Sequence, residues 1–378
     1  MTVNKRHILH AAWLRLTLCV AALAVLCVLV SCSDDSDDDG SRTVVLRFST
    51  AQTTGVTRAG TATASTAKDD DAVKDLTVLI FDSNGNVIGS KYESYSIESS
   101  TSILVSIKTR VAKDCTVYAF ANVGTLVKPS YFYGLATKAA VDSKVYTLKK
   151  NDELNASECL LMKGELTDFD TSTSAKPTVW LERLASKFDI TITAKNDATN
   201  GTWPVTIEKY QFFNVPSTTS LAKASSTVPS SYHSDASATV VNKTSSSSDA
   251  TVSIPTYYMF GNPVGKNPAA TKWTLRNASH LPSGRTCTYI RIWAHTAVWK
   301  SYFDVYLGGK TLTADGTSPT YDYTDYTIYP NYHYTVNITI KGSGHAENGA
   351  RVTYQAIPYF SVASINAWLT DKTTSIDM

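Results

Sequence analysis

Residues 74–91 read KDLTVLIFDSNGNVIGSK, and this stretch decides the fold. An apolar run over 74–81 predicts one β-strand, and 86–91 predicts its partner. Residues 82–85 between them read DSNG, in which the Asn-Gly pair readily adopts the positive φ angles of a tight turn. The sequence therefore predicts an antiparallel β-hairpin.

Alternation of apolar and polar residues continues on both sides of this hairpin. Each such stretch has one apolar face, which is typical of half-buried antiparallel strands. Helical periodicity is scarce, and only 135–144 could hold one short helix. Several short strands separated by turns predict an all-β fold, mainly β with few short helices, built of β-sandwiches. The alternating apolar positions include Val44, Leu46, Phe48, Ile103, Val105, Ile107, Phe188, Ile190, Ile192, Tyr334, Val336, Ile338 and Ile340.

Length and composition allow two domains of ordinary size. The chain has 378 residues, of which 43% are hydrophobic, and its formal net charge of +2 does not indicate a nucleic-acid partner. A polar turn cluster near 195–203 predicts a boundary, with an N-terminal domain over 59–197 and a C-terminal domain over 198–378. The Ser/Thr-rich stretch 217–249 is expected to be a long exposed loop of the second domain.

The N-terminus has the pattern of an export signal. An almost wholly apolar run over 16–30 follows a basic start, which is typical of a signal peptide and predicts one over 1–31. Residues 29–32 read LVSC and resemble a lipobox, which predicts cleavage before Cys32 and its acylation. The acidic run after it cannot pack and is expected to be a solvated tether, and a strand with one apolar face follows it within 32–58. An N-terminal anchor helix and ordinary secretion without lipid are the alternatives.

No arrangement of residues predicts an enzyme. The seven histidines form no H-E-x-x-H motif, and the sequence contains neither a P-loop nor a G-x-S-x-G elbow. The acidic run matches half of a calcium-binding loop but lacks its closing Glu. Cys115, Cys159 and Cys287 are expected to be buried thiols. We therefore predict no catalytic residue, no metal site and no cofactor.

Six short motifs carry a resemblance to a known family. They are VYAFANVG at 117–124, MKG at 162–164, LERLASK at 181–187, FNVP at 213–216, YHY at 332–334 and AW at 367–368. In this order they resemble motifs of the fimbrillins, the subunits of type V pili. Their order and spacing span about 70–370, and YMFGN at 258–262 departs from the family's Tyr-x-x-Glu-Asn. The chain thus resembles a divergent fimbrillin.

The resemblance implies a fold and a route of assembly. Fimbrillins have two tandem β-sandwich-like, transthyretin-like domains and reach the outer membrane as lipoproteins before forming fimbriae at the cell surface. A trypsin-like protease removes an N-terminal strand, and a strand from another subunit fills the open sheet edge. The implied partners are this protease, the outer membrane through the lipid, and other fimbrial subunits.

The chain offers residues for each of these steps. Cleavage is expected after Arg58, in an Ala/Thr-rich stretch, with Arg47 as the alternative. The donor strand is expected within 352–376, although this segment could also be a plain last strand of the second domain. The apolar residues of the removable strand are Val44, Leu46 and Phe48. Those of the donor strand are Ile357, Tyr359 and Ile365.

A glycan-binding surface protein is the main alternative to a polymerising subunit. Tyr321, Tyr323 and Tyr326 belong to a tyrosine-rich stretch and could form an aromatic platform for a host glycan or protein. Tyrosines that pack between two sheets would produce the same pattern. A tip adhesin, or a surface lipoprotein that does not polymerise, would account for such a platform.

Overall fold

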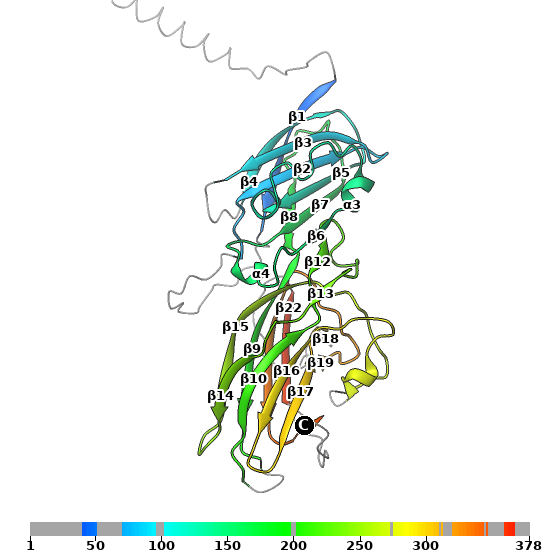
Figure 1. Ribbon diagram of the computed structural model, residues 1–378. Coiled ribbons are helices and arrows are strands. Elements are labelled where there is room, and N and C mark those ends of the chain that lie inside the picture. Colours follow the sequence, from blue (N-terminus) through cyan, green and yellow to red (C-terminus); the bar gives the residue numbers. More distant parts are fainter. Residues whose placement is uncertain are drawn as a thin grey trace, which may run out of the picture.

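The computed structural model describes residues 40–50, 70–95, 102–197, 202–272, 275–309, 311–312, 320–343, 345–346 and 359–366. Strands dominate these residues and the helices are short, which confirms the all-β prediction. Two domains lie end to end, with the N-terminal domain at one end of an elongated molecule (Figure 1).

The N-terminal domain is a closed barrel of seven strands in the order β1-β4-β3-β2-β5-β7-β8. The expected sandwich closes into a barrel because β1 pairs with strands on both of its sides. The predicted hairpin is confirmed as β2 and β3, and Asp82 Oδ1 accepts a hydrogen bond of 2.8 Å from Asn86 N across the turn. The strands are β1 (Ser41–Ser49), β2 (Asp75–Phe81), β3 (Val87–Ser94), β4 (Ile103–Arg110), β5 (Cys115–Ala121), β7 (Met162–Phe169) and β8 (Thr178–Arg183).

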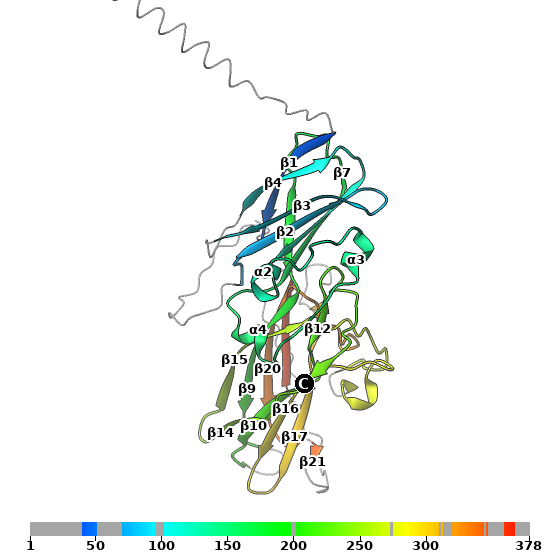
Figure 2. The ribbon, with the colours of Figure 1, turned by 45° about the horizontal axis from the view of Figure 1, so that its top comes forward.

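A second apolar layer covers the outside of β2 and β5. Phe81 and Phe120 point away from the barrel interior and are fully buried under short elements that connect the strands. Helices α2 and α3 lie over this side of the barrel (Figure 2). The predicted helix is α3, which starts after Thr137 because that side chain accepts a hydrogen bond from Ala140 N. The covering elements are α2 (Val123–Leu126), α3 (Lys138–Asp142), β6 (Val145–Thr147) and α4 (Glu153–Ala156).

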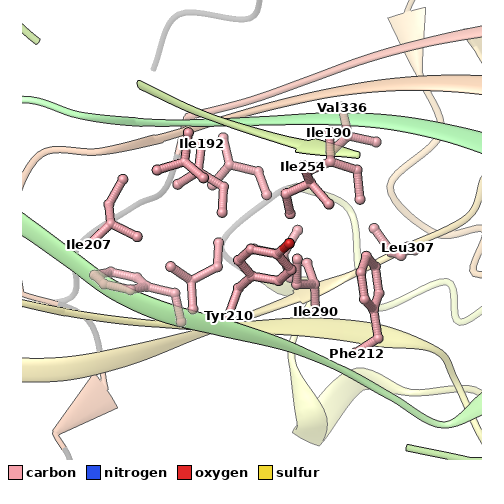
Figure 3. Packing of buried hydrophobic residues seen from close by; sticks show 14 of the residues in the cluster. Ile190, Ile192, Ile207, Tyr210, Phe212, Ile254, Ile290, Leu307 and Val336 are labelled. Carbon is pink, nitrogen blue, oxygen red and sulfur yellow. The ribbon is translucent and has the colours of Figure 1, made fainter. Parts of the chain in front are cut away.

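The C-terminal domain is a sandwich of two sheets. One has the order β14-β10-β16-β17-β21 and the other β15-β9-β20-β22. Branched aliphatic side chains from both sheets, such as Ile190 and Ile290, interdigitate in its core (Figure 3). The main strands are β9 (Ala185–Ala194), β10 (Thr206–Phe213), β14 (Thr239–Thr244), β15 (Ala250–Phe260), β16 (Tyr289–His295), β17 (Lys300–Tyr306), β20 (Tyr332–Ile340), β21 (His345–Ala346) and β22 (Tyr359–Asn366). The short elements are β11 (Val215–Pro216), β12 (Thr218–Ser220), β13 (Tyr232–His233), η2 (Ala278–His280), β18 (Thr311–Leu312) and β19 (Thr320–Tyr321).

The passage between the domains lies earlier than we expected. β8 ends at Arg183 in the barrel, and β9 begins at Ala185 in the sandwich. β9 belongs to the second domain because it pairs with β15 on one side and β20 on the other. The polar cluster near 195–203 therefore follows the first strand of the sandwich and does not separate the domains.

The Ser/Thr-rich stretch 217–249 is not one exposed loop. It contains β12, β13 and β14, and β12 pairs with β6 of the N-terminal domain. Side-chain hydroxyl groups accept hydrogen bonds from backbone N–H groups in this stretch. Thr218 Oγ1, for example, accepts one of 2.9 Å from Ser230 N. Thr218 and Leu221 are buried, so part of this stretch joins the two domains.

Candidate functional site

β1 closes the barrel by lying between β4 and β8. It is antiparallel to β4 over eight residue pairs, from Ser41↔Arg110 to Phe48↔Ile103. Its pairing with β8 is parallel and extends over only three pairs, from Arg47↔Thr178 to Ser49↔Trp180. β1 is therefore held firmly on one side and weakly on the other.

The three predicted apolar residues of β1 all point into the barrel. Val44, Leu46 and Phe48 are 3%, 0% and 0% exposed, and they pack in one core to which every other barrel strand contributes, β3 through the half-buried Ile88. Burial of side chains of this size stabilises a protein by about 1.5–3 kcal/mol each. The removal of β1 would therefore leave three apolar positions of the core unfilled.

β4 depends on β1 for its place in the barrel. Apart from the eight pairs with β1, it pairs with β3 at a single point, Gly89↔Thr109. The other neighbouring strands of the barrel share three or more pairs. A barrel without β1 would thus have an open edge on β8 and a poorly held strand in β4. We call the space between β4 and β8 that β1 occupies the β1 position.

Of the two predicted cleavage residues, the structure describes Arg47 but not Arg58. Arg47 has an exposed side chain, but its backbone N donates a hydrogen bond of 3.0 Å to Pro177 O at the start of the pairing with β8. Proteases need an extended segment that can leave its own sheet, so Arg47 is poorly placed for cleavage in this state. Arg58 and the lipidation residue Cys32 lie outside the described residues.

The predicted donor strand coincides in part with β22. This strand lies at the edge of its sheet and pairs only with β20 among the described strands, from Tyr332↔Asn366 to Thr339↔Tyr359. An edge strand can leave its sheet at the cost of a single ladder of hydrogen bonds. Tyr359 and Ile365 are thus backbone partners of β20, and Ile357 lies outside the described residues.

The expected aromatic platform does not form around Tyr326. Its side chain is 0% exposed, and the Arg276 guanidinium lies over its ring at 4.1 Å. Arg276 in turn donates hydrogen bonds to the carbonyl oxygens of Tyr323 and Asp325. These tyrosines therefore pack around a buried arginine, and sequence alternation alone did not show which face they occupy. Of Tyr321, the structure describes only the backbone.

A polar cluster that we did not predict joins the two domains. Asp70 accepts hydrogen bonds from Lys187 Nζ at 2.8 Å and from the Tyr258 hydroxyl at 2.6 Å, and burial raises the pKa of Tyr258. Arg183 Nε donates to Asp70 O at 2.8 Å, and its guanidinium also binds the Asp71 carboxylate. Arg183 and Lys187 stand in the LERLASK motif, whereas no sequence signal marked Asp70.

The remaining polar groups of the described residues bear on two kinds of site, a metal site and a reactive thiol. Among the described residues, no group of three His, Cys, Asp or Glu side chains is placed to hold a metal ion. Cys115, Cys159 and Cys287 are buried free thiols, as predicted, and burial raises the pKa of Cys287 to about 12. Such a thiol stays protonated and unreactive at neutral pH. None of the described helices has the length and apolar character to cross a bilayer.

The comparisons with known proteins point to the same strand. A family model described as major fimbrial subunit protein (FimA) matches residues 43–209, and the match begins within β1. The matched residues span most of the barrel, the first sandwich strand β9 and the start of β10. The resemblance to the fimbrillins is thereby confirmed, and this family is a structural, non-enzymatic one of cell-surface fimbriae. A second model, described as domain of unknown function (DUF4906), matches residues 257–338.

Solved structures of fimbrial proteins share the fold of the whole chain. A C-terminally truncated tip fimbrial protein, Mfa3 of Porphyromonas gingivalis, is 14% identical, with a TM-score of 0.53 over 86% of this chain and 100% of that one. A fimbrilin (FimA) of the same species is 12% identical, with a TM-score of 0.53 over 87% of this chain and 98% of that one. A comparison with curated protein sequences gives no match.

Proposed function

We propose that this protein is the lipoprotein precursor of a type V pilus subunit that polymerises by strand exchange and mediates adhesion. In this proposal Cys32 is acylated and holds the precursor at the outer membrane. A trypsin-like protease cuts after Arg58, β1 leaves with the lipid anchor, and a strand of another subunit takes the β1 position. The fibre then grows by repetition of this step.

The position of β1 is the single observation that carries the proposal. A removable strand must be continuous with a cleavable segment, fill the core with alternate side chains, and leave an edge that a new strand can pair with. β1 is followed by the Arg58 segment, inserts Val44, Leu46 and Phe48, and lies between β4 and β8. The barrel without β1 would be unstable, which favours its capture by a new strand.

The Asp70 cluster supports a cut that leaves the domains in place. The segment with Arg58 joins β1 to Asp70, and Asp70 is bound to Lys187 and Tyr258 at the domain junction. A cut between these two points would separate β1 from the chain without breaking a contact of Asp70. The subunit that remains would therefore keep the contacts of Asp70 at the domain junction.

The donor strand in this proposal comes from 352–376 of another subunit, with Ile357, Tyr359 and Ile365 as its apolar residues. The edge position of β22 supports this assignment because β22 pairs only with β20 among the described strands. Strand exchange would trade this pairing for two new ones, with β4 and with β8.

The test compares precursors treated with a trypsin-like protease. The parent should yield subunits that begin at Ala59 by mass spectrometry and fibres by electron microscopy. Arg58→Ala should stay a monomeric lipoprotein, whereas the control Arg47→Ala should assemble as the parent does. Normal fibres from Arg58→Ala, or fibres that still contain residues 41–49, would overturn the proposal.

A further inference from the structure

The outer surface beside β1 is apolar at one point. Leu104 of β4 is 55% exposed and Trp180 of β8 is 40% exposed. The other outward-facing side chains of β4, such as Ser106 and Lys108, are polar, so Leu104 is an exception among them. Most soluble proteins expose single apolar residues, but these two lie on the strands that flank one removable strand on either side.

The register shows which residue of β1 lies between them. Arg47 is paired with Leu104 on one side and with Thr178 on the other. Trp180 lies two residues beyond Thr178, so it projects from the same face and is a diagonal neighbour of Arg47. The three side chains share the outer face of the barrel.

Arg47 is a poor match for this surface. Its own side chain is exposed, and it leaves both Leu104 and Trp180 accessible to water. The inward residues of β1 match their surroundings closely, since Leu46 and Phe48 are both fully buried. β1 thus fits the inside of its position well and the outside badly.

The chain itself contains a strand with the complementary pattern. Residues 365–369 read INAWL, with Ile365, Ala367 and Leu369 on one face of an extended strand and Trp368 on the other. When the three apolar residues take the places of Val44, Leu46 and Phe48, Trp368 takes the place of Arg47. The aromatic ring would then lie between Leu104 and Trp180.

We propose that Leu104 and Trp180 select the incoming strand by an outward aromatic contact, and that residues 365–369 of a second copy provide it through Trp368. This inference rests on the proposed function and adds the identity and register of the occupant. Donation would require only the last two pairs of β22 with β20 to open, His333↔Ile365 and Tyr332↔Asn366. The greater outward burial makes the donor bind more tightly than β1, so the exchange runs in one direction.

The experiment measures how labelled peptides enter the cleaved protein. The full-length precursor is cut with a trypsin-like protease, and fluorescence anisotropy follows the uptake of a 41–49 peptide, a 363–371 peptide and its Trp368→Ser form. The 363–371 peptide should bind more tightly than its Trp368→Ser form, by up to about fivefold, because one aromatic cross-strand pair is lost. The same comparison in Leu104→Ser/Trp180→Ser protein should show no difference.

Each outcome separates this inference from the proposed function. No uptake of either the 41–49 peptide or the 363–371 peptide would show that the β1 position does not open, which overturns the proposed function and the inference with it. Uptake of the 363–371 peptide and of its Trp368→Ser form with equal affinity would overturn the inference alone. Val240→Ser, which removes an apolar side chain of β14 that is 66% exposed, serves as the matched control and should leave all affinities unchanged.

Discussion

Arg183 Nη1 donates a hydrogen bond of 2.9 Å to Asn331 Oδ1, although the two residues belong to different domains. Asn331 Oδ1 also accepts from Arg183 N at 3.2 Å, and Asn331 N donates to Ala185 O at 3.0 Å. Asn331 has a φ of 65°, a conformation that Asn tolerates better than most residues. These bonds fix the last residue of the barrel to the start of β20.

The first prediction concerns this junction. Arg183→Ala should lower the free energy of unfolding by about 2–4 kcal/mol, because a buried guanidinium that binds both domains is lost. Urea unfolding followed by tryptophan fluorescence measures the change. The control is Arg285→Ala at an exposed position, which should have a stability close to that of the parent. Equal stabilities of the two variants would contradict a structural role for Arg183.

The second prediction separates precursor from mature subunit. Leu46→Ala should destabilise the uncut precursor by about 2–5 kcal/mol, since Leu46 is fully buried in the barrel core. After removal of the segment before Ala59, variant and parent should have identical urea midpoints, because neither contains residue 46. Thr43→Ala, at an exposed position of the same strand, should leave both forms unchanged. A difference that persists in the mature form would mean that β1 stays bound.

The third prediction concerns alkaline pH. Burial raises the pKa of Cys287 to about 12 and the pKa of Tyr232 and Tyr326 to about 12, from 9.0 for Cys and 10.0 for Tyr. Above pH 9 the unfolded chain therefore binds fewer protons than the folded one. The stabilisation is fully present below pH 9 and is lost as the pH rises toward about 12.

Urea midpoints should accordingly fall between about pH 9 and about pH 11, and Cys287→Ser should reduce the fall because its hydroxyl does not titrate in this range. A midpoint that stays constant up to about pH 11 would show that these groups ionise as readily in the folded protein as in the unfolded one.

Local signals made part of the fold predictable from the sequence. The β2–β3 hairpin depends on Asn84 and Gly85 in its own turn, and Gly85 has a φ of 79°. The membership of β9 was not predictable, because its partner β20 lies far along the chain and follows directly after Asn331. The residues of β9 alternate in the same way whichever sheet the strand joins, so its own sequence does not indicate its partners.

The sequence motifs contain residues that the backbone geometry or close packing of the fold requires. Asn122 of the VYAFANVG motif is fully buried with a φ of 66°, and its side-chain amide donates to Ala72 O and Leu160 O. Gly164 of the MKG motif has no room for a Cβ, which would lie 2.8 Å from Trp180 O. The face of an alternating stretch is harder to assign, and for that reason the sequence left open whether Tyr326 is exposed or packed, whereas the structure buries it.

The last prediction concerns β4 once β1 is gone. β4 has eight residue pairs with β1 but only Gly89↔Thr109 with β3, so the mature subunit should protect the amides of 103–110 poorly. Hydrogen exchange followed by mass spectrometry should show a large increase in this strand after cleavage. β7 keeps its pairing with β5 and β8 and is the internal control.

Addition of a donor peptide should restore the protection of β4, because a strand in the β1 position supplies the missing hydrogen bonds. Slow exchange of 103–110 in the cleaved protein before any peptide is added would mean that β4 has found another partner, or that β1 has not left. Mass spectrometry of the same sample distinguishes these two cases by the presence or absence of residues 41–49. Only the absence of β1 together with a protected β4 would contradict the dependence of β4 on its neighbour.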